Sequence, residues 1–276
     1  MPKETSQTLA PDGTSIATRH WEAVGRPWAT VLLLHGIAEH SGRYERTGEL
    51  LAGSGIDTHA FDFRGHGRSG GERTDVASWQ LFLDDVADRL GALADRPRPH
   101  VLIGHSLGSL LALQYAEQNG HGGGPMPDLL VLSALTLDAS IPVHLKVLAR
   151  GLARVAPLTR IGNPIDGAQL SRDPAVGREY FADRLVTPRT TARLGVAFLR
   201  AMSDARRDLA RLAIPTLALH GGDDTLVPTR VSEPIAVLPV AERRVYPGLR
   251  HEILNEPEGP AIVAEIVEWI RAHAAA

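Results

Sequence analysis

The chain has 276 residues, a formal net charge of −3 and no cysteine. The lack of cysteine excludes disulfides, thiolate nucleophiles and cysteine-bound metals. No nucleic-acid partner is expected, because the sequence has no basic stripe with interleaved aromatic residues. The length is enough for one large α/β domain, or two smaller ones, with a sizeable buried core.

The first seven residues contain no apolar segment of the kind that a signal peptide needs. Nowhere do about 18 apolar residues follow one another, as a transmembrane helix requires. We therefore expect a cytoplasmic protein, for which peripheral contact with a membrane surface stays open.

Apolar segments of strand length alternate with helix-like segments along most of the chain. The segment at 29–34 is apolar throughout, which is typical of a parallel strand buried on both faces. The alternation predicts a mostly parallel central sheet flanked by helices. We expect strands at 15–24, after an Asp12-Gly13 turn, and at 29–34, 56–63, 101–103, 129–133, 216–220 and 243–246. We expect helices at 43–53, 79–93, 107–118 and 262–270.

The helix at 79–93 has apolar residues at helical spacing. Such spacing predicts one buried face and one solvated face. We expect Asp84, Asp85 and Asp88 to point toward solvent.

The alternation of strands and helices is interrupted at 135–212, a span far longer than usual connections. We interpret this span as an inserted helical cap on a single domain. The core of the domain would then consist of residues 1–134 and 213–276.

One stretch of the cap is a basic amphipathic helix. Its apolar face would carry Leu145, Leu148, Leu152 and Val155, and its basic face Lys146, Arg150 and Arg154. Such a helix could lie on a membrane surface and collect lipid, or it could roof the site with a solvated outer face. Its modest amphipathicity and low aromatic content favour the roof.

Residues 104–108 read GHSLG, a G-x-S-x-G signature between an apolar strand and a helix-like segment. In this signature the serine lies on a strained turn, and the glycines let strand and helix approach closely. Ser106 is therefore the candidate nucleophile, and the alternative is that it only caps the helix.

A serine hydroxyl needs a histidine to take its proton and a carboxylate to orient that histidine. The strand at 216–220 leads into a turn with two candidate carboxylates, Asp223 and Asp224. Turn geometry favours Asp224 and leaves Asp223 to brace the turn. Only two histidines follow this turn, and one of them, His273, lies near the chain end, so His251 is the candidate base.

The reaction also needs two backbone N–H groups directed at the developing oxyanion. One should belong to the residue after the nucleophile and the other to a loop after an earlier strand. These residues would be Leu107 and Ile37.

Two other motifs do not fit the sites that they resemble. The G-x-G-x-x-G match at 65–70 is not followed by the helix that a dinucleotide site requires, so it is more consistent with a loop that shapes the site. His251 and Glu252 begin like a zinc-protease motif, but Asn255 stands where the second histidine should be. We therefore expect no metal and no cofactor.

Residues 35–44, HGIAEHSGRY, resemble the HGxxEHxxRY box of the monoacylglycerol lipases. The segments at 62–71, 104–108, 171–174, 220–224 and 246–252 follow in that family's order. The resemblance covers residues 13–269 and implies an α/β-hydrolase fold, in which the cap is a lid that admits a fatty acyl chain.

The resemblance assigns roles residue by residue. The implied triad is Ser106, Asp224 and His251, with Ile37 and Leu107 as oxyanion donors. Tyr180 matches the cap tyrosine that meets the glycerol head. Glu39 and Arg43 match polar residues at the same end of the pocket.

An enzyme of this kind cleaves monoacylglycerol, a small lipid ester, to glycerol and a free fatty acid through an acyl-enzyme. The alternatives are a short-chain carboxylesterase or lysophospholipase and, more remotely, an α/β-hydrolase that binds a ligand without catalysis. The last usually lacks a member of the triad, whereas all three residues are present here.

Overall fold

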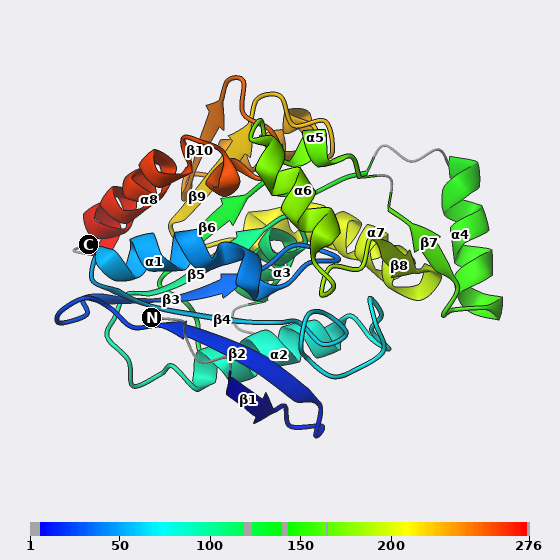
Figure 1. The fold of residues 1–276 in the computed structure, drawn as a ribbon, viewed down its shortest axis with the longest axis horizontal. Coiled ribbons are helices and arrows are strands. Elements are labelled where there is room, and N and C mark those ends of the chain that lie inside the picture. Colours follow the sequence, from blue (N-terminus) through cyan, green and yellow to red (C-terminus); the bar gives the residue numbers. More distant parts are fainter. Residues whose placement is uncertain (1–5, 119–122, 140–142, 164, 275–276) are drawn as a thin grey trace.

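The computed structural model describes residues 6–118, 123–139, 143–163 and 165–274. An eight-stranded sheet runs through the centre of the molecule, in the order β1-β2-β4-β3-β5-β6-β9-β10 (Figure 1). Only the β1–β2 and β2–β4 pairs are antiparallel. The strands are β1 (Ser6–Leu9), β2 (Ser15–Trp21), β3 (Ala29–Leu34), β4 (Ile56–Phe61), β5 (His100–His105), β6 (Leu129–Ser133), β9 (Thr216–Gly221) and β10 (Ala241–Tyr246).

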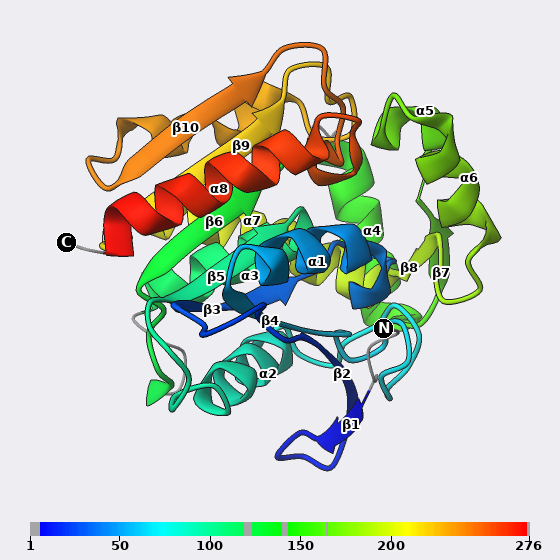
Figure 2. The ribbon, with the colours of Figure 1, turned by 60° about the vertical axis from the view of Figure 1, so that its left-hand side comes forward.

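Helices cover both faces of the sheet, as the continuously apolar strands predict. In Figure 2, α1 (Glu45–Gly53) and α8 (Gly259–Ala274) lie in front of the sheet. The opposite face packs against α2 (Gln80–Gly91), α3 (Leu107–Glu117) and α7 (Ala192–Asp208). A hydrophobic core lies on each face of the sheet. Because successive strand residues point to opposite faces, a buried strand contributes side chains to both cores. Leu32 of β3, for example, packs beside α3, whereas Leu33 packs on the side of α1 and α8.

The α/β architecture and the mostly parallel sheet are confirmed. The strands at 29–34 and 129–133 have the predicted bounds, and the others differ by a few residues at their ends. Strand β1 was not predicted, because it is short and mostly exposed and has no apolar pattern. A 3-10 turn at Ser41–Tyr44 precedes α1 and replaces the predicted first helical residues.

The prediction for one aspartate of α2 is wrong. Asp84 is exposed and Asp88 partly so, but Asp85 is buried, with only 1% of its surface exposed. Its two carboxylate oxygens accept hydrogen bonds from Nε and Nη2 of Arg64, both at 2.7 Å. A count of apolar residues cannot reveal such a partner, because Arg64 comes from the loop after β4.

Within the described residues, the segment between β6 and β9 contains four α-helices, one 3-10 turn and two short strands that pair in antiparallel orientation. Its elements are α4 (Val143–Val155), β7 (Arg160–Gly162), α5 (Gly167–Leu170), α6 (Pro174–Ala182), β8 (Arg189–Thr191), α7 and a 3-10 turn at Leu209–Arg211. Helix α7 packs against α3, whereas α4 stands at one end of the molecule (Figure 1). None of the described helices is both long and apolar enough to cross a membrane.

Candidate active site

Ser106 lies on the turn between β5 and α3 and has a positive φ of 51°. A Cβ atom on Gly104 would lie 2.3 Å from the carbonyl oxygen of Gly108. A Cβ atom on Gly108 would lie 2.3 Å from the carbonyl oxygen of Leu34 in β3. Both positions therefore require glycine, and the strained turn presents Ser106 at the carboxyl end of the sheet.

Asp224, rather than Asp223, meets the candidate base. Its Oδ2 lies 2.7 Å from Nδ1 of His251, whereas Asp223 is exposed. Its Oδ1 accepts hydrogen bonds from the backbone N–H groups of Leu226 and Val227, at 2.9 and 2.8 Å. Burial opposes its ionisation, but His251 and these donors hold the pKa of Asp224 below its ordinary value. Asp224 is thus a fixed, ionised partner for an imidazole.

A second histidine contacts the same carboxylate. Nε2 of His220 lies 3.3 Å from Oδ2 of Asp224 and 2.7 Å from the carbonyl oxygen of Val227. His220 is 1% exposed, and its Nδ1 lies 2.8 Å from Oγ of Ser232. This contact was not predicted, although His220 precedes Asp224 by only four residues.

His251 is enclosed by the loop that carries it and by its neighbours. Its ring packs edge-on against His105, with the ring centroids 4.8 Å apart. Burial lowers the pKa of His105 to about 3, so this neighbouring ring is neutral. Burial alone would also lower the pKa of His251, but the Asp224 carboxylate raises it above its ordinary value. His251 can therefore both accept and return a proton near neutral pH.

Ser106 and His251 line the same small hollow of about 40 Å³. Its wall also includes residues from the segment between β6 and β9, namely Ile165, Leu170 and Tyr180. A larger cleft of about 560 Å³ lies between α7 and the carboxyl end of α3. Neither Ser106 nor His251 lines that cleft, so we place the site at the small hollow, where the reactive groups meet.

The two predicted oxyanion donors lie on neighbouring loops. The close approach of Gly108 to Leu34 and His35 brings the loop after β3 beside the start of α3. Within the described residues, no protein group accepts a hydrogen bond from the backbone N–H of Ile37 or Leu107. Unpaired N–H groups beside a nucleophile are suited to binding an oxyanion.

The loop that carries Ile37 is held from two sides. Oε1 of Glu39 accepts a hydrogen bond from the backbone N–H of Gly36 at 2.5 Å. The carbonyl oxygen of Ala38, a residue with a φ of 67°, accepts one from the backbone N–H of Thr187 at 2.9 Å. The segment between β6 and β9 therefore fixes the oxyanion loop directly.

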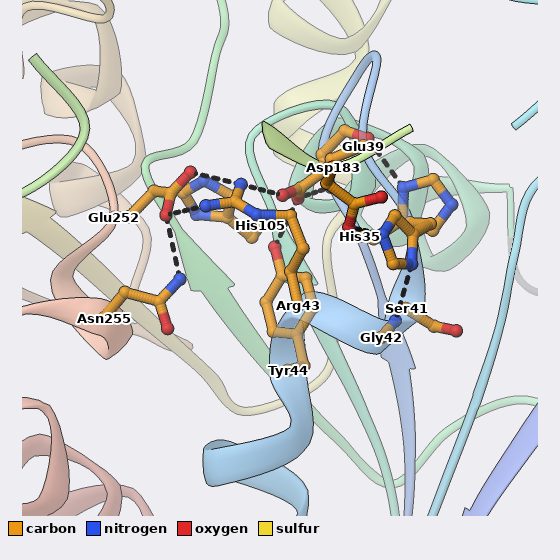
Figure 3. A network of polar contacts seen from close by, with 12 residues as sticks. His35, Glu39, Ser41, Gly42, Arg43, Tyr44, His105, Asp183, Glu252 and Asn255 are labelled. Atoms are coloured by element: carbon orange, nitrogen blue, oxygen red, sulfur yellow. Dashed lines mark hydrogen bonds and ion pairs between the residues drawn. The ribbon is translucent and has the colours of Figure 1, made fainter. Parts of the chain in front are cut away.

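Of the three residues matched to the alcohol end of the pocket, two line the hollow and one lies behind it. Figure 3 shows Glu39 and Arg43. Tyr180 and Glu39 line the hollow, and the buried hydroxyl of Tyr180 has no hydrogen-bond partner among the described residues. Arg43 does not line the hollow. Its guanidinium stacks over the Tyr180 ring, 4.7 Å from the centroid, and binds Glu39 and Glu252.

The contact between Arg43 and Glu252 was not predicted. Glu252 follows His251 directly and belongs to the 246–252 segment of the family resemblance, but no role was predicted for it beyond a rejected metal motif. Its two carboxylate oxygens accept hydrogen bonds from Nη1 and Nη2 of Arg43, at 2.7 and 2.9 Å. No spacing rule connects two residues so far apart in the sequence.

The apolar face of α4 does not roof the serine as the pattern predicted. None of its four apolar residues lines the hollow at Ser106. Leu145, Leu148 and Val155 are 45%, 67% and 80% exposed. This helix therefore offers its apolar side chains to the surroundings of the protein.

His20, Asp57 and His59 form a candidate metal-binding group among the described residues. The rings of His20 and His59 are stacked, with an angle of 6° between their planes and 4.2 Å between their centroids. An ion bound by both nitrogens would have to lie near the plane of each ring, and two parallel stacked planes do not meet. Instead, the two Nε2 atoms contact separate oxygens of Asp57, at 2.6 and 3.0 Å. The geometry is that of a hydrogen-bonded trio.

Comparison with known proteins gives matches along almost the whole chain. Residues 25–258 match the family model described as serine aminopeptidase, S33. The chain is 32% identical over 270 residues to a monoacylglycerol lipase of Mycolicibacterium smegmatis, which covers 95% of this chain and 94% of the relative. It is 32% identical over 296 residues to a monoglyceride lipase of Homo sapiens, with 98% of this chain and 96% of the relative covered.

The fold also matches solved structures. The monoacylglycerol lipase of Paleococcus ferrophilus superimposes with a TM-score of 0.82 at 31% identity, covering 94% of this chain and 99% of that one. The region matched by the family model, residues 25–258, includes strands β3 to β10, the turn at Ser106 and the segment between β6 and β9.

Proposed function

This chain belongs to the monoacylglycerol lipase family of α/β-hydrolases, and on that premise we propose that it hydrolyses monoacylglycerols to glycerol and a fatty acid. The observation that carries the proposal is the shared hollow. Ser106 on its strained turn and His251 on an ionised Asp224 face the same space. This is the arrangement that acyl transfer requires.

In the proposed mechanism, Oγ of Ser106 attacks the ester carbonyl while Nε2 of His251 takes its proton. The backbone N–H groups of Ile37 and Leu107 stabilise the negative charge on the carbonyl oxygen. The carbon–oxygen bond to glycerol then breaks, and His251 gives its proton to the departing alkoxide. A water molecule, deprotonated by His251, releases the fatty acid and restores Ser106.

The alcohol end of the substrate is assigned to the side of the hollow formed by Tyr180 and Glu39. The unpartnered hydroxyl of Tyr180 supports this assignment, since a buried polar group needs a hydrogen-bond partner. Arg43 supports this end from behind, because it stacks on Tyr180 and does not face the hollow.

The acyl end requires more space than the hollow offers. Ligand sites usually measure about 300–1,000 Å³, far above the 40 Å³ beside Ser106. Residues 135–212, the proposed cap, must therefore shift to admit an acyl chain. The exposed apolar side chains of α4 are the surface that we assign to contact with a lipid phase.

A fluorophosphonate probe and a substrate panel test this function. The probe should label the wild-type chain and not Ser106→Ala, and persistent labelling of the variant would overturn the choice of nucleophile. Monoacylglycerols of graded chain length should be turned over faster than p-nitrophenyl butyrate and lysophosphatidylcholine. A preference for either of the other two esters would assign the chain to esterase or lysophospholipase chemistry instead.

A further inference from the structure

Arg43 lies behind the hollow and is almost fully enclosed, with 9% of its side chain exposed. Its Nη1 contacts both Oε2 of Glu39, at 2.5 Å, and Oε1 of Glu252, at 2.7 Å. Its Nη2 contacts the second oxygen of Glu252 at 2.9 Å. One guanidinium therefore joins two buried carboxylates that come from opposite ends of the sequence (Figure 3).

Each of these carboxylates is attached to one part of the catalytic machinery. Glu39 accepts the backbone N–H of Gly36, the residue before the proposed oxyanion donor Ile37, and the hydroxyl of Tyr44 at 2.7 Å. Glu252 is the residue after His251 and also accepts a hydrogen bond from Nδ2 of Asn255 at 2.8 Å. Removal of Arg43 would leave both buried carboxylates without a counter-charge, which is strongly unfavourable, so their positions depend on this arginine.

The electrostatics support a permanent ion network. Burial opposes the ionisation of Glu39, but Arg43 beside it holds the pKa of Glu39 below its ordinary value. Burial likewise disfavours the charged guanidinium, but Glu252 and Glu39 raise the pKa of Arg43 above its ordinary value. Two carboxylates and one guanidinium leave a net negative charge, which lies beside the base.

We propose that Arg43 is a positioning residue that fixes the oxyanion loop relative to the loop of His251, and that it acts without touching the substrate. This proposal rests on the proposed function, since it concerns the same site. It reassigns Arg43, because the sequence resemblance placed it against the glycerol head. The outer side of Arg43 borders a separate cleft of about 370 Å³, so contact with the leaving alcohol is the competing interpretation.

The discriminating experiment compares esters that share the acyl chemistry but differ in the alcohol. For Arg43→Met, kcat/KM should fall about 10²-fold on both monobutyrin and p-nitrophenyl butyrate, the scale expected when reacting groups are displaced by about 1 Å. The rate of fluorophosphonate labelling should fall by the same factor. A loss confined to the glycerol ester, mainly in KM, would overturn the proposal.

Further variants distinguish a loss of positioning from a folding defect. Arg43→Lys keeps the charge but loses the two-pronged contact, so it should recover part of the activity, about tenfold below wild type. Glu252→Gln is tested alone and combined with Arg43→Met. The loss of kcat/KM in the double variant should be smaller than the product of the two single losses, because both changes break the same link. Multiplying losses would show that the two residues act separately.

The pH profile gives a second readout. The carboxylate of Glu252 is one of the charges that raise the pKa of His251. Without that charge the imidazole loses its proton at lower pH, so the acid limb of kcat/KM should move to lower pH in Glu252→Gln. An unmoved limb would contradict the assignment of Glu252 to the environment of His251.

Arg172→Met is the matched control. Arg172 also pairs with glutamates of the 250–258 region, Glu256 and Glu258, but does not contact the oxyanion loop. It should change kcat/KM less than about twofold. The buried Glu256 keeps its hydrogen bonds from the Ser171 hydroxyl and from the backbone N–H groups of Arg172 and Arg250, and the pair with Glu258 is exposed to solvent. If labelling by the probe is normal while no monoacylglycerol is cleaved, the proposed function fails but the positioning role can still be measured.

Discussion

The two parts of the segment between β6 and β9 are attached very differently. The part from α5 to β8 is bound to the catalytic loops by backbone hydrogen bonds, from Glu252 to Leu170 at 2.8 Å and from Thr187 to Ala38 at 2.9 Å. A side-chain contact between His40 and Asp183, at 2.8 Å, adds to them. Helix α4 packs mainly on α7 and leaves Val147 and other apolar side chains exposed. We call the part from α5 to β8 the wall of the site. Helix α4, in contrast, is an exposed surface.

This difference separates two tasks that a single cap was predicted to perform. The wall holds the oxyanion loop and the loop of His251 in register, so its integrity should affect every substrate. The exposed helix does not reach Ser106, so it should affect only substrates that are delivered from a lipid phase. Substitutions that affect the wall and substitutions in α4 should therefore have different effects.

The largest expected effect concerns the charge that orients His251, whose loop the wall holds. Asp224→Asn should lower kcat by about 10⁴-fold on every ester, because the amide would hold the unproductive tautomer of His251. Its side-chain oxygen can still accept the two backbone hydrogen bonds, so the melting temperature should change little. Asp223→Asn is the matched control, and a comparable loss in that exposed neighbour would contradict the choice of Asp224. Turnover of p-nitrophenyl butyrate and thermal melting measure both.

The next effect breaks the wall at a glycine contact. A Cβ atom on Gly177 in α6 would lie 2.7 Å from Cα of Gly167 in α5, so Gly177→Ala must push the two helices apart. We expect a lower melting temperature and a loss of kcat/KM of about 10²-fold on short and long esters alike, because α5 holds the loop of His251.

The same substitution in α4 provides the comparison. Beyond the backbone of its own helix and its chain neighbours, a Cβ atom on Gly151 would meet no atom within 4 Å. Gly151→Ala should therefore stabilise the helix by up to about 1 kcal/mol and leave the turnover of soluble esters unchanged. Equal losses in the two alanine variants would abolish the distinction between the wall and the exposed helix.

The smallest effect sharpens the role of α4. Replacing both Val147 and Leu148 by serine should weaken binding to phosphatidylcholine–phosphatidylglycerol vesicles about tenfold, which corresponds to about 1.4 kcal/mol. This is less than the about 1.5–3 kcal/mol that full burial of each side chain contributes, because a lipid surface buries them only in part. Activity on monoacylglycerol in these vesicles should fall in parallel, while p-nitrophenyl butyrate is unaffected. Val237→Ser, at an apolar position 81% exposed outside the segment, is the control for non-specific effects. Unchanged vesicle binding would remove α4 from lipid contact.

The sequence supported the parts of the fold that depend on local patterns. Uninterrupted apolar strands gave the parallel sheet, and the order of Ser106, Asp224 and His251 along the chain matched the ends of strands β5 and β9 and the loop after β10. What it could not give were contacts that depend on distant partners. The burial of Asp85 depends on Arg64, and the position of Arg43 depends on Glu252, which no periodicity links to it. The direction of the apolar face of α4 was also missed, because a pattern defines a face but not what covers it.

The small hollow beside Ser106 has a consequence for the timing of turnover. A space of about 40 Å³ holds little more than a water molecule or two, so a long acyl chain can leave only while the protein is open. We therefore expect that inhibition by a fatty-acid product depends on how long the product stays bound. Products with longer chains should dissociate more slowly. Stopped-flow release of a fluorescent fatty acid measures this, and dissociation rates independent of chain length would show that opening does not limit escape.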